Sequence, residues 1–319
     1  MNDTMQKNKL GNSDLKVSQL GLGCMGMSEF YGSHDDNDSI KTIHYAIDNG
    51  INFFDTADMY GLGANEMLLG KALQDRRDKA VIATKFGVLR GEDGSFPGLN
   101  GKPEYVKLAC EKSLQRLKVD QIDLYYLHRV DPNTPIEDTV GAMSELVKEG
   151  KVKYIGLSEA SEEIIRKAHK VHPITAVQTE YSLWSNDLGA VFTVCRELNI
   201  ALIAYSPLGR GFLSGKYKSR DDFEKGDFRR DNPRFSDENI AKNLEIVAKV
   251  KDMAKSKSAT PAQIALAWIL SKGTDVFPLT GTKTIKYLKE NIESTNIKLK
   301  KDEIEQLDNL HSLVSGSRY

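Results

Sequence analysis

Short apolar runs and longer amphipathic segments alternate along the chain. Eight runs rich in Val, Ile, Leu and Tyr have the length and composition of buried strands, and they lie at 17–23, 52–58, 80–86, 123–129, 153–159, 175–182, 201–208 and 275–281. The segments between them have helical periodicity. In the stretch 36–50, Ile40, Ile43 and Ile47 fall on one helical face and Gly50 follows as a stop signal. This alternation predicts repeated strand–helix units around a parallel sheet.

Eight such units without a break in composition predict an α/β fold, a closed (β/α)8 TIM barrel that forms a single domain over residues 1–319. A barrel of this kind usually takes about 250 residues, which leaves room for insertions. Two polar insertions are expected, one at 90–103 and one from Gly209 to about Ser236. The stretch 9–18 is expected to form a short hairpin before the barrel.

Each predicted strand changes character near its C-terminal end. The residues at these changes are Gly23, Asp55, Lys85, His128, Ser158, Gln178, Tyr205 and Gly281. In a barrel these ends share the face on which active sites are built. A lysine inside an apolar strand is costly to bury without a partner, so Asp55, at the end of the preceding strand, is the expected counter-ion of Lys85.

One motif offers an alternative fold. The stretch "GLGCMG" at 21–26 matches the glycine fingerprint of Rossmann dinucleotide-binding domains. That fingerprint requires a helix to open at its last glycine, whereas a polar loop follows here and apolar periodicity begins only at Ile40. The closed barrel is therefore the favoured interpretation.

Composition and charge limit the classes of binding partner and the cellular location that we expect. The 319 residues carry a formal charge of -1 and no basic block, so we expect no basic surface that would bind nucleic acid or an anionic membrane. No apolar stretch approaches the roughly 20 residues of a membrane span, and no signal core follows the N-terminal charges. The three cysteines, Cys24, Cys110 and Cys195, are too scattered for a disulfide framework. We therefore expect a cytoplasmic protein with a small-molecule ligand.

Eight motifs in order carry a resemblance that spans nearly the whole chain. They are "GLGCMGMSEFYG", "FFDTADMYG", "ATKFG", "YYLHRVDP", "GLSEAS", "QTEYSLW", "AYSPLGRGFLSGK" and "GTKTIKYLKEN". The chain resembles the aldo-keto reductase superfamily, in its bacterial and plant branch of short-tailed barrels. The resemblance implies an NADP(H)-dependent reductase of carbonyl compounds, with Asp55, Tyr60, Lys85 and His128 as the catalytic set.

The chemistry of hydride transfer explains why such a set is useful. Negative charge develops on the carbonyl oxygen, and a tyrosine with a pKa of about 10 is a weak acid unaided. A lysine ammonium about 4 Å away stabilises the phenolate by roughly 4 kcal/mol at an effective dielectric of about 20. This attraction predicts a Tyr60 pKa near neutrality. Asp55 would hold Lys85 protonated, and His128 would donate a hydrogen bond to the carbonyl.

The cofactor NADP(H) is expected across the barrel mouth. By resemblance, Ser158 and Gln178 bind its carboxamide, Tyr205 stacks on its nicotinamide ring, and Arg210 and Lys216 contact its pyrophosphate. The full set that the resemblance assigns to the cofactor is Gly23, Met25, Asp55, Ser158, Gln178, Tyr205, Ser206, Leu208, Gly209, Arg210, Lys216, Gly281, Thr282, Lys283, Glu290 and Asn291.

The stretch 281–291 should hold the adenosine 2'-phosphate, with Thr282, Lys283 and the N-terminus of the following helix as donors. Many family members carry an arginine where this chain has Tyr287. A forked phosphate ligand is thereby lost, which predicts a moderate preference for NADPH over NADH. Lys283 and Lys286 are expected to compensate in part.

The substrate contacts expected from the resemblance are Tyr31, Tyr60, His128 and Arg129. Met25, Trp184 and the stretch 228–239 are further candidates for pocket walls. The tail at 314–319 is too short for a large lid, which predicts an open mouth and a broad range of aldehydes.

Two histidines, His169 and His172, have metal-like spacing but no third ligand nearby, so no metal site is expected. The expected partner is a small-molecule carbonyl compound, and no oligomer is required to complete the site.

Two other functions remain open on the sequence. One is a nucleotide-binding regulatory subunit of the kind that the potassium-channel β subunits of this family represent. The other is a barrel aldolase that uses Lys85 as a Schiff-base nucleophile. Asp55 works against the aldolase, because it would hold the lysine charged.

Overall fold

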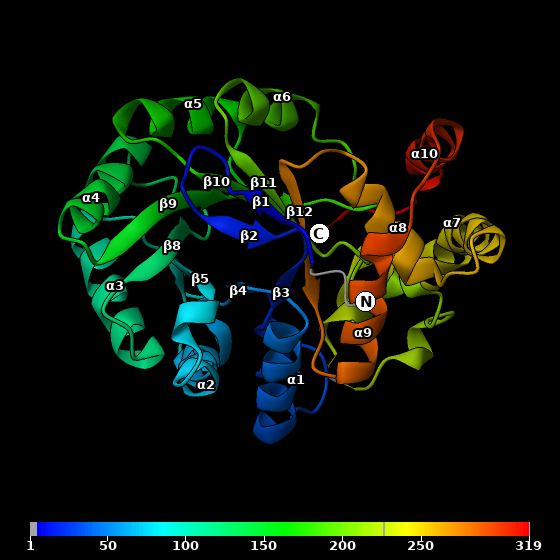
Figure 1. Ribbon diagram of the computed structural model, residues 1–319, viewed down its shortest axis with the longest axis horizontal. Helices are drawn as coiled ribbons and strands as arrows, with labels where there is room; N and C mark the ends of the chain where they lie inside the picture. Colours follow the sequence, from blue (N-terminus) through cyan, green and yellow to red (C-terminus); the bar gives the residue numbers. More distant parts are fainter. Residues whose placement is uncertain (1–4, 226, 319) are drawn as a thin grey trace.

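The computed structural model describes residues 5–225 and 227–318, and its centre is a closed barrel of parallel strands (Figure 1). The strands pair around the ring in the order β10-β11-β12-β3-β4-β5-β8-β9. Their bounds are β3 (Gly21–Gly23), β4 (Phe53–Asp55), β5 (Val81–Phe86), β8 (Ile122–Leu127), β9 (Val152–Ser158), β10 (Ala176–Glu180), β11 (Ala201–Tyr205) and β12 (Val276–Gly281). The predicted (β/α)8 barrel is confirmed.

The helices that link consecutive strands lie around this ring (Figure 1). They are α1 (Asp36–Asp48), α2 (Ala64–Leu73), α3 (Pro103–Leu117), α4 (Ile136–Lys148), α5 (Glu162–Val171), α6 (Gly189–Glu197) and α8 (Pro261–Leu270), with α9 (Ile285–Glu293) after the last strand. Two additional helices, α7 (Asp237–Ser256) and α10 (Lys301–Asp308), lie at one side of the ring. The helix predicted within 36–50 is therefore present as α1.

Local sequence signals explain where these helices begin. Asp35 caps α1 by accepting a hydrogen bond from the backbone N–H of Asp38, as an N-cap aspartate does. Thr260 and Gln263 form a capping box at α8, with Pro261 at the first helical position, where its missing N–H has no consequence.

The two predicted insertions contain short elements of their own. The first carries β7 (Gly98–Leu99), which pairs with β6 (Val88–Leu89) just before the insertion. The second, which follows β11, is a series of single turns: η4 (Phe212–Ser214), η5 (Arg220–Asp222), η6 (Phe228–Asp231) and η7 (Pro233–Phe235). Both insertions follow strand ends, on the side of the barrel where the candidate site is expected.

The hairpin is formed by β1 (Lys7–Lys9) and β2 (Lys16–Ser18), and it covers the opposite end of the barrel (Figure 1). Its apolar side chains Leu10, Leu15 and Val17 pack against residues of the barrel interior such as Phe53. The prediction of a single strand over 17–23 is corrected in one respect. Val17 and Ser18 pair with the hairpin, and only Gly21–Gly23 joins the barrel, because Ser18 and Asn52 exchange hydrogen bonds where the chain turns in.

Successive side chains of a strand point to opposite faces, so the inward positions can be followed strand by strand. In β5, Val81 and Ala83 belong to the interior cluster, and Lys85 is the next residue of the same parity. Their neighbours Ile82 and Phe86 pack in the outer cluster between barrel and helices. The same alternation brings the last inward residue of each strand to the C-terminal mouth.

The barrel interior is filled closely beneath that mouth, and Gly156 shows how closely. A Cβ atom at Gly156 would lie 2.5 Å from the ring of Tyr126 and 2.7 Å from the backbone oxygen of Ala176. Neither group can move easily, because Tyr126 is fully buried and Ala176 belongs to β10. Only glycine therefore fits at this point of β9.

We expect Gly156→Ala to lower the free energy of unfolding by about 1–3 kcal/mol, measured by urea denaturation, because the added methyl group overpacks the interior. Gly141→Ala is the matched control. Nothing lies within 4 Å of a Cβ at Gly141 in α4, so this change should raise stability by about 0.4–1 kcal/mol. A Gly156→Ala protein as stable as the unmodified chain would contradict the packing argument.

Candidate active site

Four side chains that the sequence predicts as a catalytic set meet at the C-terminal mouth of the barrel. Asp55 is the last residue of β4, and Lys85 lies near the end of β5. His128 follows β8 directly, and Tyr60 begins the short helix η2 (Tyr60–Gly63) after β4. All four are buried.

Lys85 and Asp55 form an ion pair inside the protein. The ammonium group of Lys85 donates hydrogen bonds to Asp55 Oδ1 and, at 2.8 Å, to the backbone oxygen of Thr56. The exposed fractions of the two side chains are 0% and 3%. Burial alone would lower the pKa of Lys85, but the charges of Asp55 and Tyr60 more than offset this, so the pKa lies above its ordinary value. The predicted pairing is confirmed, and Lys85 is a cation at neutral pH.

The Tyr60 ring lies beside this cation, with its centre 5.1 Å from Lys85 Nζ. The chain reverses immediately after it: Gly61, Leu62 and Gly63 all have left-handed backbones, with φ of 54°, 55° and 90°. Leu62 is the strained member, because a side chain disfavours this conformation. The sharp turn leaves Tyr60 packed against Met25, Ala57 and Val88 at the mouth.

The expected ionisation of Tyr60 is wrong. Burial raises the pKa of the phenol above its ordinary value, and the charge of Lys85 offsets only part of that rise. The attraction between lysine and phenolate can be estimated from residue types, whereas the cost of desolvating the phenol depends on the packing around it. Tyr60 is therefore a protonated phenol at neutral pH, which is the form that donates a proton.

His128 lies edge-on to Tyr60, with ring centres 5.8 Å apart and planes at 87°. Burial lowers the pKa of the imidazole well below its ordinary value, and the charges of Lys85 and Arg129 lower it further. The ring is therefore neutral at pH 7. Nδ1 is buried and has no hydrogen-bond partner in the part of the chain that the structure describes.

The three residues expected at the nicotinamide lie on adjacent strands. Gln178 of β10 is in register with Ser158 of β9, and Tyr205 ends β11. Each is engaged by a protein group. Gln178 Nε2 donates to Asp55 Oδ2 at 2.7 Å, Ser158 Oγ accepts from Arg129 at 3.1 Å, and the Tyr205 hydroxyl accepts from Arg318 at 2.5 Å.

The loop expected at the pyrophosphate leaves β11 through several left-handed residues. Ser206, Gly209 and Arg210 have φ of 49°, 55° and 57°. Two of these are not glycine, and such strain concentrates at functional sites. Arg210 forms an ion pair with Glu180 at 3.3 Å, whereas Lys216 is exposed. Leu208 is partly buried and packs against the outer hydrophobic cluster.

The residues expected at the 2'-phosphate surround the start of α9. Gly281, the first residue of this stretch, pairs in register with Gly23 of β3, which is expected elsewhere on the cofactor. Thr282 Oγ1 accepts a hydrogen bond from the backbone N–H of Thr284, and no side chain caps α9. Lys283 reaches back to the backbone oxygens of Tyr31, at 2.6 Å, and of Ser33.

Farther along α9, the remaining residues of the stretch 281–291 differ in their exposure to solvent. Tyr287 is 42% exposed. Glu290 accepts a hydrogen bond from Thr260 at 2.6 Å, and Asn291 is buried.

The candidate substrate residues are only partly at the mouth. Met25 packs beside Tyr60, and Arg129 lies between His128 and Ser158. Tyr31 packs against Phe228 of the second insertion, with ring centres 6.3 Å apart. Trp184 is not a pocket wall as expected. It is 1% exposed and stacks on Phe212 at 4.4 Å, because the turns after β11 fold over it.

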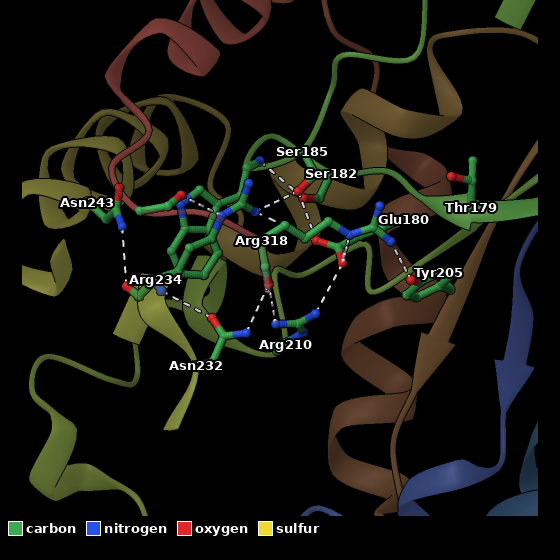
Figure 2. A network of polar contacts seen from close by, with 12 residues as sticks. Thr179, Glu180, Ser182, Ser185, Tyr205, Arg210, Asn232, Arg234, Asn243 and Arg318 are labelled. Atoms are coloured by element: carbon green, nitrogen blue, oxygen red, sulfur yellow. Dashed lines mark hydrogen bonds and ion pairs between the residues drawn. The ribbon is translucent and has the colours of Figure 1, made fainter. Parts of the chain in front are cut away.

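Three charged residues at the mouth were missed by sequence reasoning. Glu180 ends β10 and has the same parity as Gln178, so strand alternation could have identified it. Glu159 follows Ser158 with a left-handed φ of 54°. Arg318 contacts Glu180 at 2.8 Å (Figure 2) and Glu159 at 2.5 Å. No local pattern indicates the last contact, because it spans well over a hundred residues.

Two kinds of feature are absent from the described residues. Within residues 5–225 and 227–318, no group of three His, Cys, Asp or Glu side chains is arranged to hold a metal ion. His169 instead accepts a hydrogen bond from the backbone N–H of Ile174 at 3.1 Å. Among the described helices, none has the length and apolar character that a bilayer span requires.

Comparison with known sequences identifies similar proteins over nearly the whole length. A family model with the description "Aldo/keto reductase family" matches residues 19–312. A curated relative from Glycine max, "Probable aldo-keto reductase 1", is 49% identical over 323 residues, which cover 99% of this chain and 92% of the relative.

Solved structures with the same fold include two further relatives. One is the glycerol dehydrogenase AKR11B4 from Gluconobacter oxydans, with a TM-score of 0.87 and 28% identity over 96% of this chain and 94% of that one. The other is the aldo-keto reductase AKR11C1 from Bacillus halodurans in its holo form, with a TM-score of 0.79 and 27% identity over 99% and 98%.

Proposed function

Because this chain belongs to the aldo/keto reductase family, and is thus an oxidoreductase of that type, we propose that it reduces small aldehydes and some ketones to alcohols with NADPH. One observation carries the proposal. A protonated phenol, Tyr60, lies at the barrel mouth beside the buried cation of Lys85. Such an arrangement can protonate a carbonyl oxygen on which negative charge develops.

The residues at the mouth fit a nicotinamide cofactor by their chemistry. A carboxamide needs a donor and an acceptor, and Ser158 and Gln178 offer both from neighbouring strands in register. Tyr205 ends the next strand and offers a flat apolar face. When bound, the cofactor supplies the hydride, and the protein has to hold the substrate, exclude water and deliver the proton.

In this proposal Tyr60 gives its hydroxyl proton to the substrate oxygen as the alcohol forms. Lys85 stabilises the phenolate left behind, and its charge acts strongly because the pair is shielded from water. Asp55 is a positioning residue that fixes the ammonium group. His128, neutral because of its lowered pKa, offers an N–H to the substrate oxygen without competing as an acid.

The aldolase alternative is disfavoured by the same ion pair. A Schiff-base lysine must lose its proton to become a nucleophile, and the pKa of Lys85 is raised rather than lowered. Borohydride trapping with carbonyl compounds should therefore give no covalent adduct.

The test of the proposed function is the oxidation of NADPH in the presence of a panel of small aldehydes, followed by absorbance. Aldehyde-dependent oxidation with alcohol as the product supports the proposal. A protein that binds NADPH tightly and turns over none of the aldehydes would instead be a nucleotide-binding regulatory protein.

We place the 2'-phosphate at the start of α9, because the first N–H groups of an uncapped helix attract anions and Lys283 is close by. Each charge-assisted hydrogen bond to the phosphate contributes roughly 1.5–3 kcal/mol to the free energy of binding. Without an arginine at Tyr287, discrimination should favour NADPH by roughly one to two orders of magnitude.

We expect Lys283→Ala to weaken NADPH binding about tenfold and NADH binding much less, because only NADPH carries the phosphate. Tyr287→Arg should strengthen NADPH binding without helping NADH. The measurement is the Kd of each cofactor by fluorescence quenching at fixed ionic strength, because salt screens phosphate contacts.

Lys289→Ala is the matched control, since Lys289 is an exposed lysine within α9, farther from the helix start than Lys283. Equal Kd values for NADH and NADPH in the unmodified protein would exclude a phosphate site here. Equal losses for both cofactors in Lys283→Ala would show that this lysine acts elsewhere on the dinucleotide.

A further inference from the structure

The segment 314–318, here called the tail segment, returns from the last helical turn η9 (Asn309–Leu313) to the start of α7. The backbone N–H of Ser315 donates a hydrogen bond to Asn243 Oδ1 at 2.8 Å, and Asn243 Nδ2 donates one to the backbone oxygen of Ser315 at 2.9 Å. The Ser315 hydroxyl donates to Asn239 at 2.7 Å. The tail segment is therefore fixed to α7.

Beyond this anchor the tail segment runs to the barrel mouth, against the expectation that it would leave the mouth open. The backbone oxygen of Arg318 accepts hydrogen bonds from Asn232 at 3.0 Å and from Arg210 at 3.5 Å (Figure 2). Both partners belong to the insertion after β11. The backbone thus reaches the loop that is expected to bind the pyrophosphate.

The side chain of Arg318 then crosses to the strand ends. Its guanidinium donates to Glu180 at 2.8 Å and to the Tyr205 hydroxyl at 2.5 Å (Figure 2). It also donates to Glu159 at 2.5 Å. The guanidinium carbon lies 5.7 Å from the centre of the Tyr205 ring. Arg318 therefore ties the ends of β10 and β11, and the residue after β9, to the insertion.

The strength of this contact follows from its surroundings. The exposed fractions of the Arg318, Glu159 and Glu180 side chains are 26%, 19% and 3%. Burial alone would raise the pKa of Glu159, but the hydrogen bond and charge of Arg318 hold it below its ordinary value. Glu159 is thus an ionised partner of Arg318, and Glu180 is a second, almost fully buried carboxylate in contact with the same guanidinium, in surroundings that screen charges less than bulk water does.

Tyr205 is also the residue proposed to stack on the nicotinamide. The other two proposed contacts of that ring are likewise occupied by protein groups, Ser158 by Arg129 and Gln178 by Asp55. Arg318 differs from those groups because it reaches the site from outside the barrel. Its side chain can leave without disturbing a strand.

We propose that the tail segment is an autoinhibitory latch, in which Arg318 holds Tyr205 and must leave it before a nicotinamide dinucleotide binds. The proposal rests on the proposed function, because it takes Tyr205 to be the platform for the nicotinamide. When only a fraction of the protein is in the binding-competent state, the apparent Kd equals the intrinsic Kd divided by that fraction. A latch closed about nine-tenths of the time would thus weaken binding about tenfold.

The experiment measures the Kd of NADPH by isothermal titration calorimetry at fixed ionic strength, with no substrate present. Arg318→Ala and a chain that stops at Val314 should each bind NADPH about tenfold more tightly than the unmodified protein. Glu159→Gln should tighten binding about threefold, because it weakens the latch from the other side. Arg196→Ala is the matched control. This arginine pairs with Asp275 before β12, at the opposite end of the barrel, and its loss should leave the Kd unchanged.

An unchanged or larger Kd in Arg318→Ala, with folding verified by circular dichroism, would overturn the latch. A larger Kd would show that Arg318 helps to hold the cofactor. Should Arg318→Ala fail to fold, Glu159→Gln and the shortened chain decide in the same way. An unmodified protein that binds neither NADPH nor NADH would refute the proposed function itself, which is a different result from a failed latch.

Discussion

Tyr60→Phe should lower the turnover of aldehyde reduction by about 10²–10⁴-fold, the usual contribution of a general acid. The Kd of NADPH should stay within about twofold, since the hydroxyl acts only where charge develops on the substrate oxygen. The aromatic ring remains, so its contacts with His128 and with Met25 persist. The measurements are steady-state reduction rates and cofactor titration on the same preparation.

Tyr154→Phe is the control for removing a phenolic hydroxyl elsewhere on the barrel. Tyr154 lies near the start of β9 and donates a hydrogen bond to Asp14 of the hairpin at 2.8 Å, away from the mouth. Its loss should leave turnover within about twofold of the unmodified protein, as is usual for changes remote from the site. Turnover in Tyr60→Phe equal to that of the control would remove Tyr60 from the proton-transfer role.

The barrel and the position of the candidate site follow from the sequence for a simple physical reason. Strand side chains alternate with a period of two, so one polar residue at the end of an apolar run fixes which positions face inward. Asp55, Lys85 and Gln178 all share parity with interior residues of their strands, such as Phe53, and all lie at the mouth.

Two features of the site depend on tertiary packing and could not be predicted from the sequence. The attraction between Lys85 and a phenolate can be estimated from residue types, but the desolvation that raises the pKa of Tyr60 depends on what packs around it. The contact of Arg318 with Glu159 and Tyr205 depends on how the insertion after β11 folds. Neither has a local sequence signal.

Lys85→Met should have the second large effect, seen most clearly in the reverse reaction. Oxidation of an alcohol needs Tyr60 as the phenolate, so its rate rises with pH up to the pKa of the phenol. The charge of Lys85 lowers that pKa against the effect of burial, and its loss lets the pKa rise further. At a fixed pH below the pKa, oxidation should fall about 10²–10³-fold, and the rising limb of the pH profile should move to higher pH.

Reduction should respond differently to the same change, because Tyr60 is protonated at neutral pH with or without Lys85. The loss there reflects only the missing stabilisation of charge in the transition state, and it should not vary with pH near neutrality. An oxidation profile that keeps its midpoint in Lys85→Met would falsify the coupling between the two side chains.

Folding has to be separated from chemistry in this test, because Lys85→Met leaves the carboxylate of Asp55 buried without its cation. Breaking a buried pair from one side costs about 3–5 kcal/mol of stability, whereas replacing both partners costs much less. The double variant Asp55→Asn/Lys85→Met should therefore unfold at a higher urea concentration than Lys85→Met alone. It should still show the shifted oxidation profile, because the cation near Tyr60 is absent in both. A double variant that regains the unmodified profile together with its stability would mean that Lys85 acts through the fold and not through the phenol.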